Sequence, residues 1–332
     1  MSDEFLALLR ADGTVRHAGA TLTPLTGGVS SEIYLVRDGE ERFVVKRALA
    51  KLNVPDDWFA DVGRNAYEVE YLRTAGALVP GAVPTLRTAP PGHGYFAMEF
   101  LKAGFENWKA LMLRGVAEEA HARAAGEVLG TIHRETWDDA AVRRRFDTTA
   151  GFRELRTDPY LLTTGRRHPD LEGLFAEEVG RIERNRRCLV HGDFSPKNML
   201  IRGERLVVLD CEVAWFGDPT FDAGFLLNHL FLKALHRPGQ RGRQLKMVRA
   251  FWAAYSARLG PERAAEVGRA LPRLLLMLML ARVDGKSPVE YLRDDEAAKA
   301  TIRDFTTRHL RRVPGSLEEL TALWGSRLEE IL

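Results

Sequence analysis

The chain has 332 residues, of which 45% are hydrophobic and 28% are charged, so it is long enough to bury a large core in one domain or in two smaller lobes. Its 48 Lys and Arg nearly balance its 46 Asp and Glu, and the formal net charge of +2 provides no global attraction for nucleic acid or for an anionic membrane. Any function that depends on charge must therefore be local.

The start of the chain and its apolar stretches indicate no secretion signal and no membrane span. The sequence MSDEFLALLRADG has acidic residues where a secretory signal would carry basic ones. The apolar stretch 270–281 contains Pro272 and Arg273 and is too short to cross a bilayer, so we expect a buried helix there. Cys188 and Cys211 lie in apolar runs, where reduced core thiols are expected. These features predict a cytoplasmic protein.

The N-terminal part, to residue 101, has the pattern of a small β-rich lobe. Two short runs rich in β-branched and aromatic residues, 32–36 and 42–46, flank the turn 37–40 and predict a hairpin. A helix is predicted over 61–74. A further strand is predicted over 95–101, after a connection rich in Pro and Gly.

Beyond residue 101 the apolar positions recur at three- and four-residue spacing, which predicts helices over 117–135, 172–187 and 223–236. Strand patterns nearly vanish there. The exceptions are three short apolar runs, 188–190, 199–201 and 206–209. We therefore expect an α+β protein with a domain boundary between residues 101 and 102.

Polar residues concentrate between two of these runs, in His191-Gly192-Asp193-Phe194-Ser195-Pro196-Lys197-Asn198. Asp210 follows at the end of the run 206–209, so an Asn, two Asp and a His can converge. A lone Asp usually caps a turn. The ordered set instead favours phosphoryl transfer, in which a carboxylate orients and deprotonates a hydroxyl while Mg²⁺ neutralises phosphate charge. Asp193 would be the base, and Asn198 and Asp210 would offer oxygen ligands to Mg²⁺.

The segments HGDFSPKN, LVVLDCE and GDPTFDAG resemble the catalytic and metal-binding segments of the aminoglycoside phosphotransferase and choline kinase superfamily, whose members are distant relatives of protein kinases. The resemblance covers nearly the whole chain. It implies a two-lobed, protein-kinase-like fold that uses ATP and Mg²⁺. Residues 1–101 would form a nucleotide-binding lobe with a small antiparallel sheet, and residues 102–332 a larger helical lobe with the catalytic loop and the substrate site.

Two segments of the first lobe match the nucleotide-binding positions of this superfamily. Gly27, Gly28 and Ser30 lie where the phosphate-covering loop would be, and small residues allow backbone N–H groups to approach phosphate oxygens. A Gly-Gly pair before a strand is, however, more often only a turn. Glu99 and Leu101 lie where the family's linker hydrogen-bonds adenine through its backbone, although a core strand would have the same sequence.

A lysine and a glutamate of the first lobe form the next match. Lys46 ends the second strand of the hairpin, where related kinases place the lysine that contacts the α- and β-phosphates. Its usual partner is a helical glutamate, and both Glu68 and Glu70 are available. Residues two apart cannot share a helix face, and the resemblance favours Glu68.

The segment after Asp210 narrows the substrate class. The gap before Gly217-Asp218-Pro219 is too short for the activation segment on which protein kinases dock peptides. Glu212 lies two residues after Asp210, on the same side of an extended chain, so both could reach one metal. This segment resembles methylthioribose kinases more than aminoglycoside-resistance enzymes, although Asn198 departs from their pattern. A sugar-like alcohol is the favoured acceptor.

Two polar residues, Asp222 and His191, are predicted to support the site. An Asp at a helix start commonly caps it, and in this superfamily the position of Asp222 braces the catalytic loop. His191 is better placed to hold the loop by hydrogen bonds than to transfer protons. His133 has the pattern of a helix-packing residue.

Arg282 and Asp284 follow the apolar stretch 274–280 and loosely resemble the arginine-bearing segment that methylthioribose kinases use for substrate. A helix C-terminus with a favourable Arg and a Gly cap explains the same residues equally well. Residues 223–332 contain 19 Lys and Arg against 12 Asp and Glu, which disfavours polycationic aminoglycosides.

These patterns predict an ATP- and Mg²⁺-dependent kinase that phosphorylates a hydroxyl of a sugar-like or related small alcohol. Aminoglycoside and choline- or homoserine-type acceptors stay open as alternatives, as does a catalytically inactive nucleotide-binding regulator. The expected partner is a small-molecule substrate, without nucleic acid or membrane, and a homodimer is possible.

Overall fold

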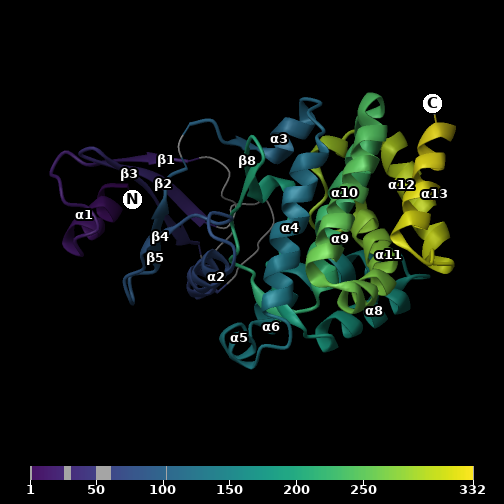
Figure 1. The fold of residues 1–332 in the computed structure, drawn as a ribbon, viewed down its shortest axis with the longest axis horizontal. Helices are drawn as coiled ribbons and strands as arrows, with labels where there is room; N and C mark the ends of the chain where they lie inside the picture. Colours follow the sequence, from purple (N-terminus) through teal and green to yellow (C-terminus); the bar gives the residue numbers. More distant parts are fainter. Residues whose placement is uncertain (1, 26–30, 50–60, 102, 332) are drawn as a thin grey trace. The chain divides into compact units, whose positions relative to one another are not determined.

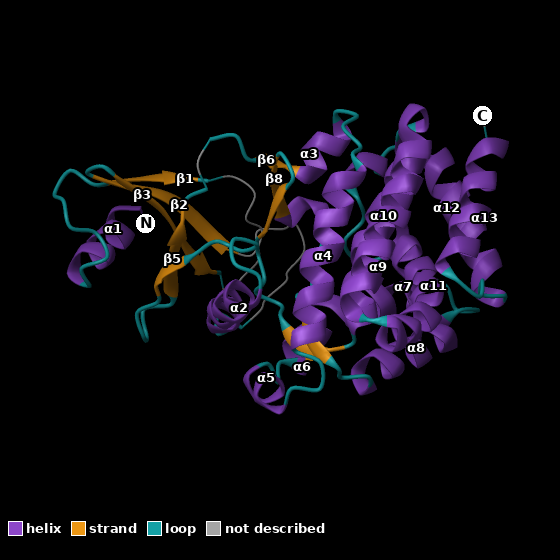
Figure 2. Ribbon diagram, viewed as in Figure 1, coloured by secondary structure: helices purple, strands orange, loops and turns teal. Residues whose placement is uncertain are grey.

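The computed structural model describes residues 2–25, 31–49, 61–101 and 103–331, and the chain divides into two compact units, Met1–Phe105 and Glu106–Leu332. The first unit holds a five-stranded sheet, and helices dominate the second (Figure 2). The predicted α+β class is confirmed. The boundary lies at residue 105, in the connection that follows the last strand of the first unit.

The first unit is built on an antiparallel sheet with the strand order β1-β2-β3-β5-β4. Its strands are β1 (Thr21–Pro24), β2 (Ser31–Asp38), β3 (Glu41–Ala48), β4 (Leu86–Thr88) and β5 (Tyr95–Glu99), and its helices are α1 (Ser2–Ala11) and α2 (Arg64–Leu78). The predicted hairpin is confirmed: β2 and β3 pair from Ser31↔Ala48 to Asp38↔Glu41. Gly39 turns the chain with φ +60°, which favours glycine.

Helix α2 begins at Arg64 rather than at the predicted residue 61. The Asp61 carboxylate accepts a hydrogen bond from the N–H of Gly63 (2.9 Å), and this local bond competes with helix formation. The helix also runs past the predicted end, to Leu78, because it tolerates Gly76 in its last turn and the first proline after it is Pro80. Strand β5 ends at Glu99, two residues before the predicted end.

Alternation along the strands gives the sheet two different faces. Helix α1 packs on one face, where Phe5 contacts the rings of Tyr34 and Tyr95 at centroid distances of 5.8 and 5.5 Å. Phe43 and Val45 belong to the same core. Because successive side chains of a strand point to opposite faces, the residue after Val45 points away from this core. Lys46 therefore lies on the opposite face of the sheet, beside Val44 of the same strand and opposite Phe96 of β5, both of which are buried.

The second unit contains most of the helices (Figure 1). They are α3 (Trp108–Leu113), α4 (Glu119–Glu135), α5 (Ala140–Arg145), α6 (Thr149–Phe152), α7 (Thr163–Arg167), α8 (Glu172–Arg184), α9 (Pro219–His236), α10 (Arg241–Leu259), α11 (Pro261–Asp284), α12 (Glu296–Arg311) and α13 (Leu317–Glu330). Shorter helical segments are η1 (Arg153–Leu162), η2 (Pro196–Asn198), η3 (Pro238–Gln240) and η4 (Glu290–Leu292). The three helices predicted in this region are confirmed, with boundaries shifted by a few residues.

Short antiparallel ladders complete the second unit. Strand β7 (Cys188–Val190) pairs with β10 (Trp215–Gly217). Strand β8 (Met199–Arg202) lies between β6 (Glu106–Asn107) and β9 (Arg205–Val208). The three predicted apolar runs are therefore strands. The first two, β7 and β8, directly precede and follow the polar segment 191–198.

Helices α4 and α10 run side by side at short range (Figure 1). A Cβ atom on Gly126 would lie 2.5 Å from the carbonyl oxygen of Phe251, and one on Gly130 would lie 2.8 Å from the Cβ of Arg258. Both distances are shorter than van der Waals contact, so this packing requires glycine at both positions.

The apolar stretch 270–281 is part of α11, and residues 274–281 are fully buried, as predicted. None of the described helices is long and apolar enough to cross a membrane. Cys188 and Cys211 are both buried, in agreement with the sequence.

Candidate active site

The polar segment 191–198 connects two of the short ladders. It leaves β7, which is paired with β10, and enters β8 through the 3₁₀ turn η2. The N–H of Leu209 donates to the carbonyl oxygen of Asn198 (2.8 Å), which joins the segment to the chain that leaves β9. Residues near 193 and near 210 are thereby held in one part of the helical unit.

Asp222 anchors the start of this segment from helix α9. Its fully buried carboxylate accepts hydrogen bonds from the backbone N–H groups of His191 (2.7 Å) and Gly192 (2.9 Å). His133 Nε2 lies 3.4 Å from the same carboxylate, and His133 Nδ1 lies 3.0 Å from the hydroxyl of Tyr255. His133 therefore contacts a polar network as well as packing between helices.

The helix cap belongs to another residue. Helix α9 begins at Pro219, before the predicted residue 223, and Asp218 caps it by accepting a hydrogen bond from Thr220 N–H (2.8 Å). Capping by Asp222 was wrong because Pro219 starts the helix one turn earlier. This start frees the Asp222 carboxylate for the loop, which agrees with the bracing position that the resemblance implies.

His191 holds the segment through both ring nitrogens. Nδ1 accepts from the N–H of Asp193 (3.1 Å), and Nε2 donates to the carbonyl oxygen of Leu209 (3.1 Å). Burial lowers the pKa of His191 below its ordinary value despite the nearby Asp222 carboxylate. A neutral ring with these two bonds positions the loop and leaves no nitrogen for proton transfer.

Asp193 is the buried carboxylate of the segment, with 3% of its surface exposed. Its Oδ2 lies 3.0 Å from Arg156 Nη2 and 2.9 Å from Lys197 Nζ. Among the described residues, its buried Oδ1 has no hydrogen-bond partner. Burial alone would raise the pKa of Asp193, but Lys197 and Arg156 outweigh burial and lower it. The carboxylate is therefore ionised at neutral pH, with one oxygen free to accept a hydrogen bond.

Arg156 is a site residue that sequence reasoning missed. It comes from the π-helical segment η1, and its Nε donates to the carbonyl oxygen of Gly192. Nothing in the local sequence distinguishes Arg156 from the other arginines nearby. Its role can be inferred only from the tertiary structure, in which packing brings Arg156 to Asp193.

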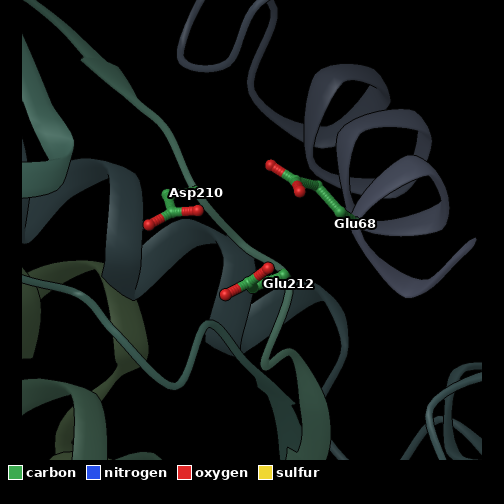
Figure 3. A group of neighbouring side chains, drawn as sticks. All are labelled: Glu68, Asp210 and Glu212. Carbon is green, nitrogen blue, oxygen red and sulfur yellow. The ribbon is translucent and has the colours of Figure 1, made fainter. Parts of the chain in front are cut away.

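The predicted metal ligands lie in the same unit. Asn198 Nδ2 donates to the main-chain oxygen of Asp193 (3.0 Å), which leaves the amide oxygen as the ligand atom. Carboxylate oxygens of Asp210 and Glu212 lie within 4.8 Å of each other (Figure 3). These are hard oxygen donors of the kind that Mg²⁺ prefers, so the residues fit the ion.

The reason why Asp210 and Glu212 converge differs from the predicted one. The chain is not extended here: β9 ends at Val208, Asp210 has φ +62°, and Glu212 begins a turn. A non-glycine residue in the left-handed region is strained, and such strain concentrates at functional sites. The turn, rather than strand alternation, brings the two carboxylates together.

Lys46 of β3 pairs with Glu68 of α2 within the first unit. Nζ lies 2.8 Å from the carboxylate, and each side chain is only 2% exposed. The Glu68 side chain projects from α2 (Figure 3). Glu70 instead lies 3.6 Å from Arg73 on the same helix. A buried ion pair costs desolvation energy and adds little stability, which makes a functional reason for it attractive.

Five other residues are predicted to bind the nucleotide. Gly27, Gly28 and Ser30 lie outside the described residues. Glu99 accepts hydrogen bonds from Thr85 N–H and Oγ1 (3.2 and 3.1 Å), and its own N–H donates to the Thr85 carbonyl oxygen. Leu101 follows β5 in a loop. Since the N–H of Glu99 is occupied, a backbone donor for adenine would have to come from elsewhere, such as Leu101.

A profile of the phosphotransferase enzyme family, APH, matches residues 21–267, which is well over half of the chain. The chain belongs to this family. The match includes the Lys46–Glu68 pair, the segment 191–198 and the carboxylates at 210 and 212.

Two curated relatives of this family member are methylthioribose kinases. The enzyme of Pectobacterium carotovorum subsp. carotovorum is 23% identical, and that of Pectobacterium atrosepticum is 24% identical, each over 264 residues. These matches cover 68% of this chain and 66% of each relative, slightly less than two thirds of the relatives' length.

Solved structures share the fold at low identity. An amicoumacin kinase in complex with AMP-PNP and Ca²⁺ has a TM-score of 0.59 at 15% identity, covering 97% of this chain and 100% of that chain. A choline/ethanolamine kinase family protein from Mesorhizobium loti has a TM-score of 0.54 at 17% identity, covering 97% and 98%. They confirm the predicted protein-kinase-like α+β fold.

Asp284 and Arg282, the two residues predicted to bind the substrate, have different surroundings. The Asp284 carboxylate accepts from Arg303 Nη2 (2.7 Å) and Nε (2.9 Å) and lies 2.9 Å from His168 Nε2. Both of its oxygens are engaged, so Asp284 fastens the end of α11, and we correct its assignment to substrate. Arg282 is buried and donates through Nη1 to the hydroxyl of Tyr160 (3.2 Å).

Replacing Lys197 by Met should shift the acid limb of this family member's pH–rate profile upward. Lys197 is one of the cations that lower the pKa of Asp193, so without it Asp193 binds a proton at higher pH. We expect the acid limb of kcat/KM to move up by about one pH unit. Rate measurements from pH 4 to 8 on Lys197→Met and on the exposed control Lys246→Met test this. An unmoved limb in Lys197→Met would contradict it.

Proposed function

We propose that this family member is an ATP- and Mg²⁺-dependent kinase that phosphorylates a hydroxyl of a sugar-like or related small alcohol. The observation that carries the proposal is the Asp193 carboxylate. Arg156 and Lys197 keep it ionised through Oδ2, while its buried Oδ1 has no partner among the described residues. A buried acceptor atom of this kind suits a substrate hydroxyl.

In the proposed reaction, Oδ1 of Asp193 accepts a hydrogen bond from the acceptor hydroxyl and aims its oxygen at the γ-phosphorus of ATP. A bond forms between that oxygen and the γ-phosphorus, the bond from the γ-phosphorus to the β–γ bridging oxygen breaks, and ADP leaves. The hydroxyl proton passes to Asp193. Because its pKa is lowered, Asp193 is a weak base, so orientation is its larger contribution and proton transfer comes late.

The remaining residues hold the nucleotide and the ion. Asn198, Asp210 and Glu212 offer oxygen ligands for Mg²⁺, which when bound would neutralise phosphate charge. Lys46, oriented by Glu68, would contact the α- and β-phosphates. Gly27, Gly28 and Ser30 would cover the phosphates, and the backbone near Glu99 and Leu101 would bind adenine. The AMP-PNP and Ca²⁺ in the similar amicoumacin kinase support a nucleotide with a divalent cation.

The acceptor class rests on two observations. The similar curated proteins are methylthioribose kinases, which act on a sugar-like alcohol. The excess of basic residues over 223–332 also disfavours a polycationic acceptor. Buried Arg282, linked to Tyr160, is the predicted substrate residue that we retain.

A screen of sugars, nucleosides, amino alcohols and aminoglycosides for acceptor-dependent ADP release tests the proposal. We expect release with sugar-like alcohols in the presence of Mg²⁺ and its loss when EDTA removes the ion, because the oxygen ligands bind a divalent cation with the nucleotide. The ATP-dependent rise in Tm provides a second readout. Failure of every acceptor, together with no effect of ATP and Mg²⁺ on Tm, would refute the proposal.

A further inference from the structure

Four polar side chains gather in the helical unit beyond the residues that hold Asp193. They are His229 and Lys233 of α9, Arg282 of α11 and Tyr291 of η4. His229 and Lys233 lie one turn apart on the same face of α9. We call these four residues the basic cluster.

The basic cluster is buried and only partly satisfied, since Arg282 Nη1 donates to Ser287 as well as to Tyr160. Lys233, His229 and Arg282 have exposed fractions of 0%, 5% and 8%. Within the described parts of the chain, Lys233 Nζ, His229 Nδ1, Arg282 Nε and the Tyr291 hydroxyl have no hydrogen-bond partner. Lys233 Nζ faces the ring of Tyr291 at 4.7 Å from the centroid. Buried polar atoms are rarely left unpaired, so four in one place indicate a binding site for a polar ligand.

Charge in the cluster is also unbalanced. The carboxylate near Lys233 is that of Glu290, and Glu290 already forms an ion pair with Lys109. Burial and the charges of Lys109 and Arg282 lower the pKa of Lys233 to about 7. Burial and Lys233 likewise lower the pKa of His229. A negatively charged ligand would remove this electrostatic penalty.

Contacts lead from the cluster to the catalytic carboxylate. Arg282 donates to the Tyr160 hydroxyl (3.2 Å), and the guanidinium of Arg156 lies 6.0 Å from the centre of the Tyr160 ring. Arg156 in turn contacts Asp193 (3.0 Å). Tyr160 thus lies between Arg282 of the cluster and Arg156, which holds Asp193.

We propose that the basic cluster binds an anionic group, a carboxylate or a phosphoryl group, carried by the acceptor alcohol. This inference rests on the proposed kinase function. Lys233 and the free Nε of Arg282 donate charge-assisted hydrogen bonds to the anion. His229 and the Tyr291 hydroxyl supply further polar contacts. The acceptor is then a sugar acid or a sugar phosphate rather than a neutral sugar.

Matched acceptor pairs test the anion directly. Gluconate is compared with sorbitol, and glycerol 3-phosphate with glycerol, at constant ionic strength. We expect wild type to prefer the anionic member of at least one pair, and Lys233→Met to lower the anionic-to-neutral ratio of kcat/KM about 100-fold, mainly through KM. The exposed control Lys246→Met should retain the wild-type ratio. Comparison of the two pairs decides between carboxylate and phosphoryl group.

A binding measurement separates this inference from the kinase proposal and from misfolding. Lys233→Met should raise the Tm of the free protein, because it removes a buried unpaired cation, and should abolish the extra Tm rise that the anionic compounds give wild type. If wild type releases no ADP with any acceptor but shows this Lys233-dependent shift, the anion site stands and the kinase function fails. If ADP release occurs but neither the kinetic ratio nor the shift depends on Lys233, the anion site is wrong.

Discussion

Replacing Asp193 by Asn should lower kcat for acceptor-dependent ADP release by about 10²- to 10⁴-fold while ATP binding persists. The amide keeps the size of the side chain but cannot take the hydroxyl proton. It also removes the negative charge that pairs with Arg156 and Lys197. Steady-state kinetics gives kcat, and the ATP-dependent Tm shift of the variant reports nucleotide binding.

A matched control for this variant is Asp294→Asn, since Asp294 is exposed on the surface. It should have wild-type kcat, because a surface Asp-to-Asn change alters no buried contact. An Asp193→Asn protein with the kcat of wild type would remove Asp193 from the mechanism. A variant that also loses the ATP-dependent Tm shift would indicate general disruption of the site instead.

Replacing Asp222 by Ala should give the largest loss of stability that the site offers. The buried N–H groups of His191 and Gly192 lose their acceptor, and His133 Nε2 loses the nearby carboxylate. Each buried polar group left unsatisfied costs about 1–3 kcal/mol, so the free energy of unfolding should fall by several kcal/mol. Urea denaturation measures this loss, and kcat should fall as well because the catalytic loop is no longer anchored.

Two further variants separate anchoring from the mere loss of a charge. Asp222→Asn retains one carbonyl acceptor and should fall between wild type and Asp222→Ala in its denaturation midpoint. Asp147→Ala removes an exposed aspartate that pairs with Arg186, and its free energy of unfolding should match that of wild type within about 0.5 kcal/mol. An Asp222→Ala midpoint equal to that of wild type would show that Asp222 does not anchor the loop.

The hairpin β2–β3 and the strands around residues 191–209 follow from local sequence. Apolar alternation, β-branched residues and turn residues act between near neighbours, so their effect can be predicted without the rest of the chain. The boundaries were less predictable. Helix α2 starts late because the Asp61 side chain binds the N–H of Gly63. Helix α9 starts early because Asp218 caps it and Pro219 occupies its first position.

The order and spacing of Asp193, Asn198 and Asp210 were sufficient to predict phosphoryl-transfer chemistry, and the family match agrees with that prediction. The contacts of residues elsewhere in the helical unit were harder to predict from the sequence. Asp284 was assigned to substrate, yet Arg303, nineteen residues further along the chain, occupies its carboxylate. No local sequence pattern predicts that Asp284 of α11 pairs with a residue of α12.

The sequence by itself was sufficient to predict the fold class, the phosphotransferase family and the chain positions proposed for its catalytic residues. Those features depend on periodicity and on the spacing within one short segment. Only the tertiary structure shows that Arg156 helps to lower the pKa of Asp193 and that several polar side chains share one buried region of the helical unit. The cations Arg156 and Lys197 meet on Asp193, and His229, Lys233, Arg282 and Tyr291 share one buried region. Lys197 is only four residues from Asp193. The contacts of Arg156 with Asp193 and of Lys233 with Tyr291 instead join residues far apart in the chain, so they exist only after the helices have packed.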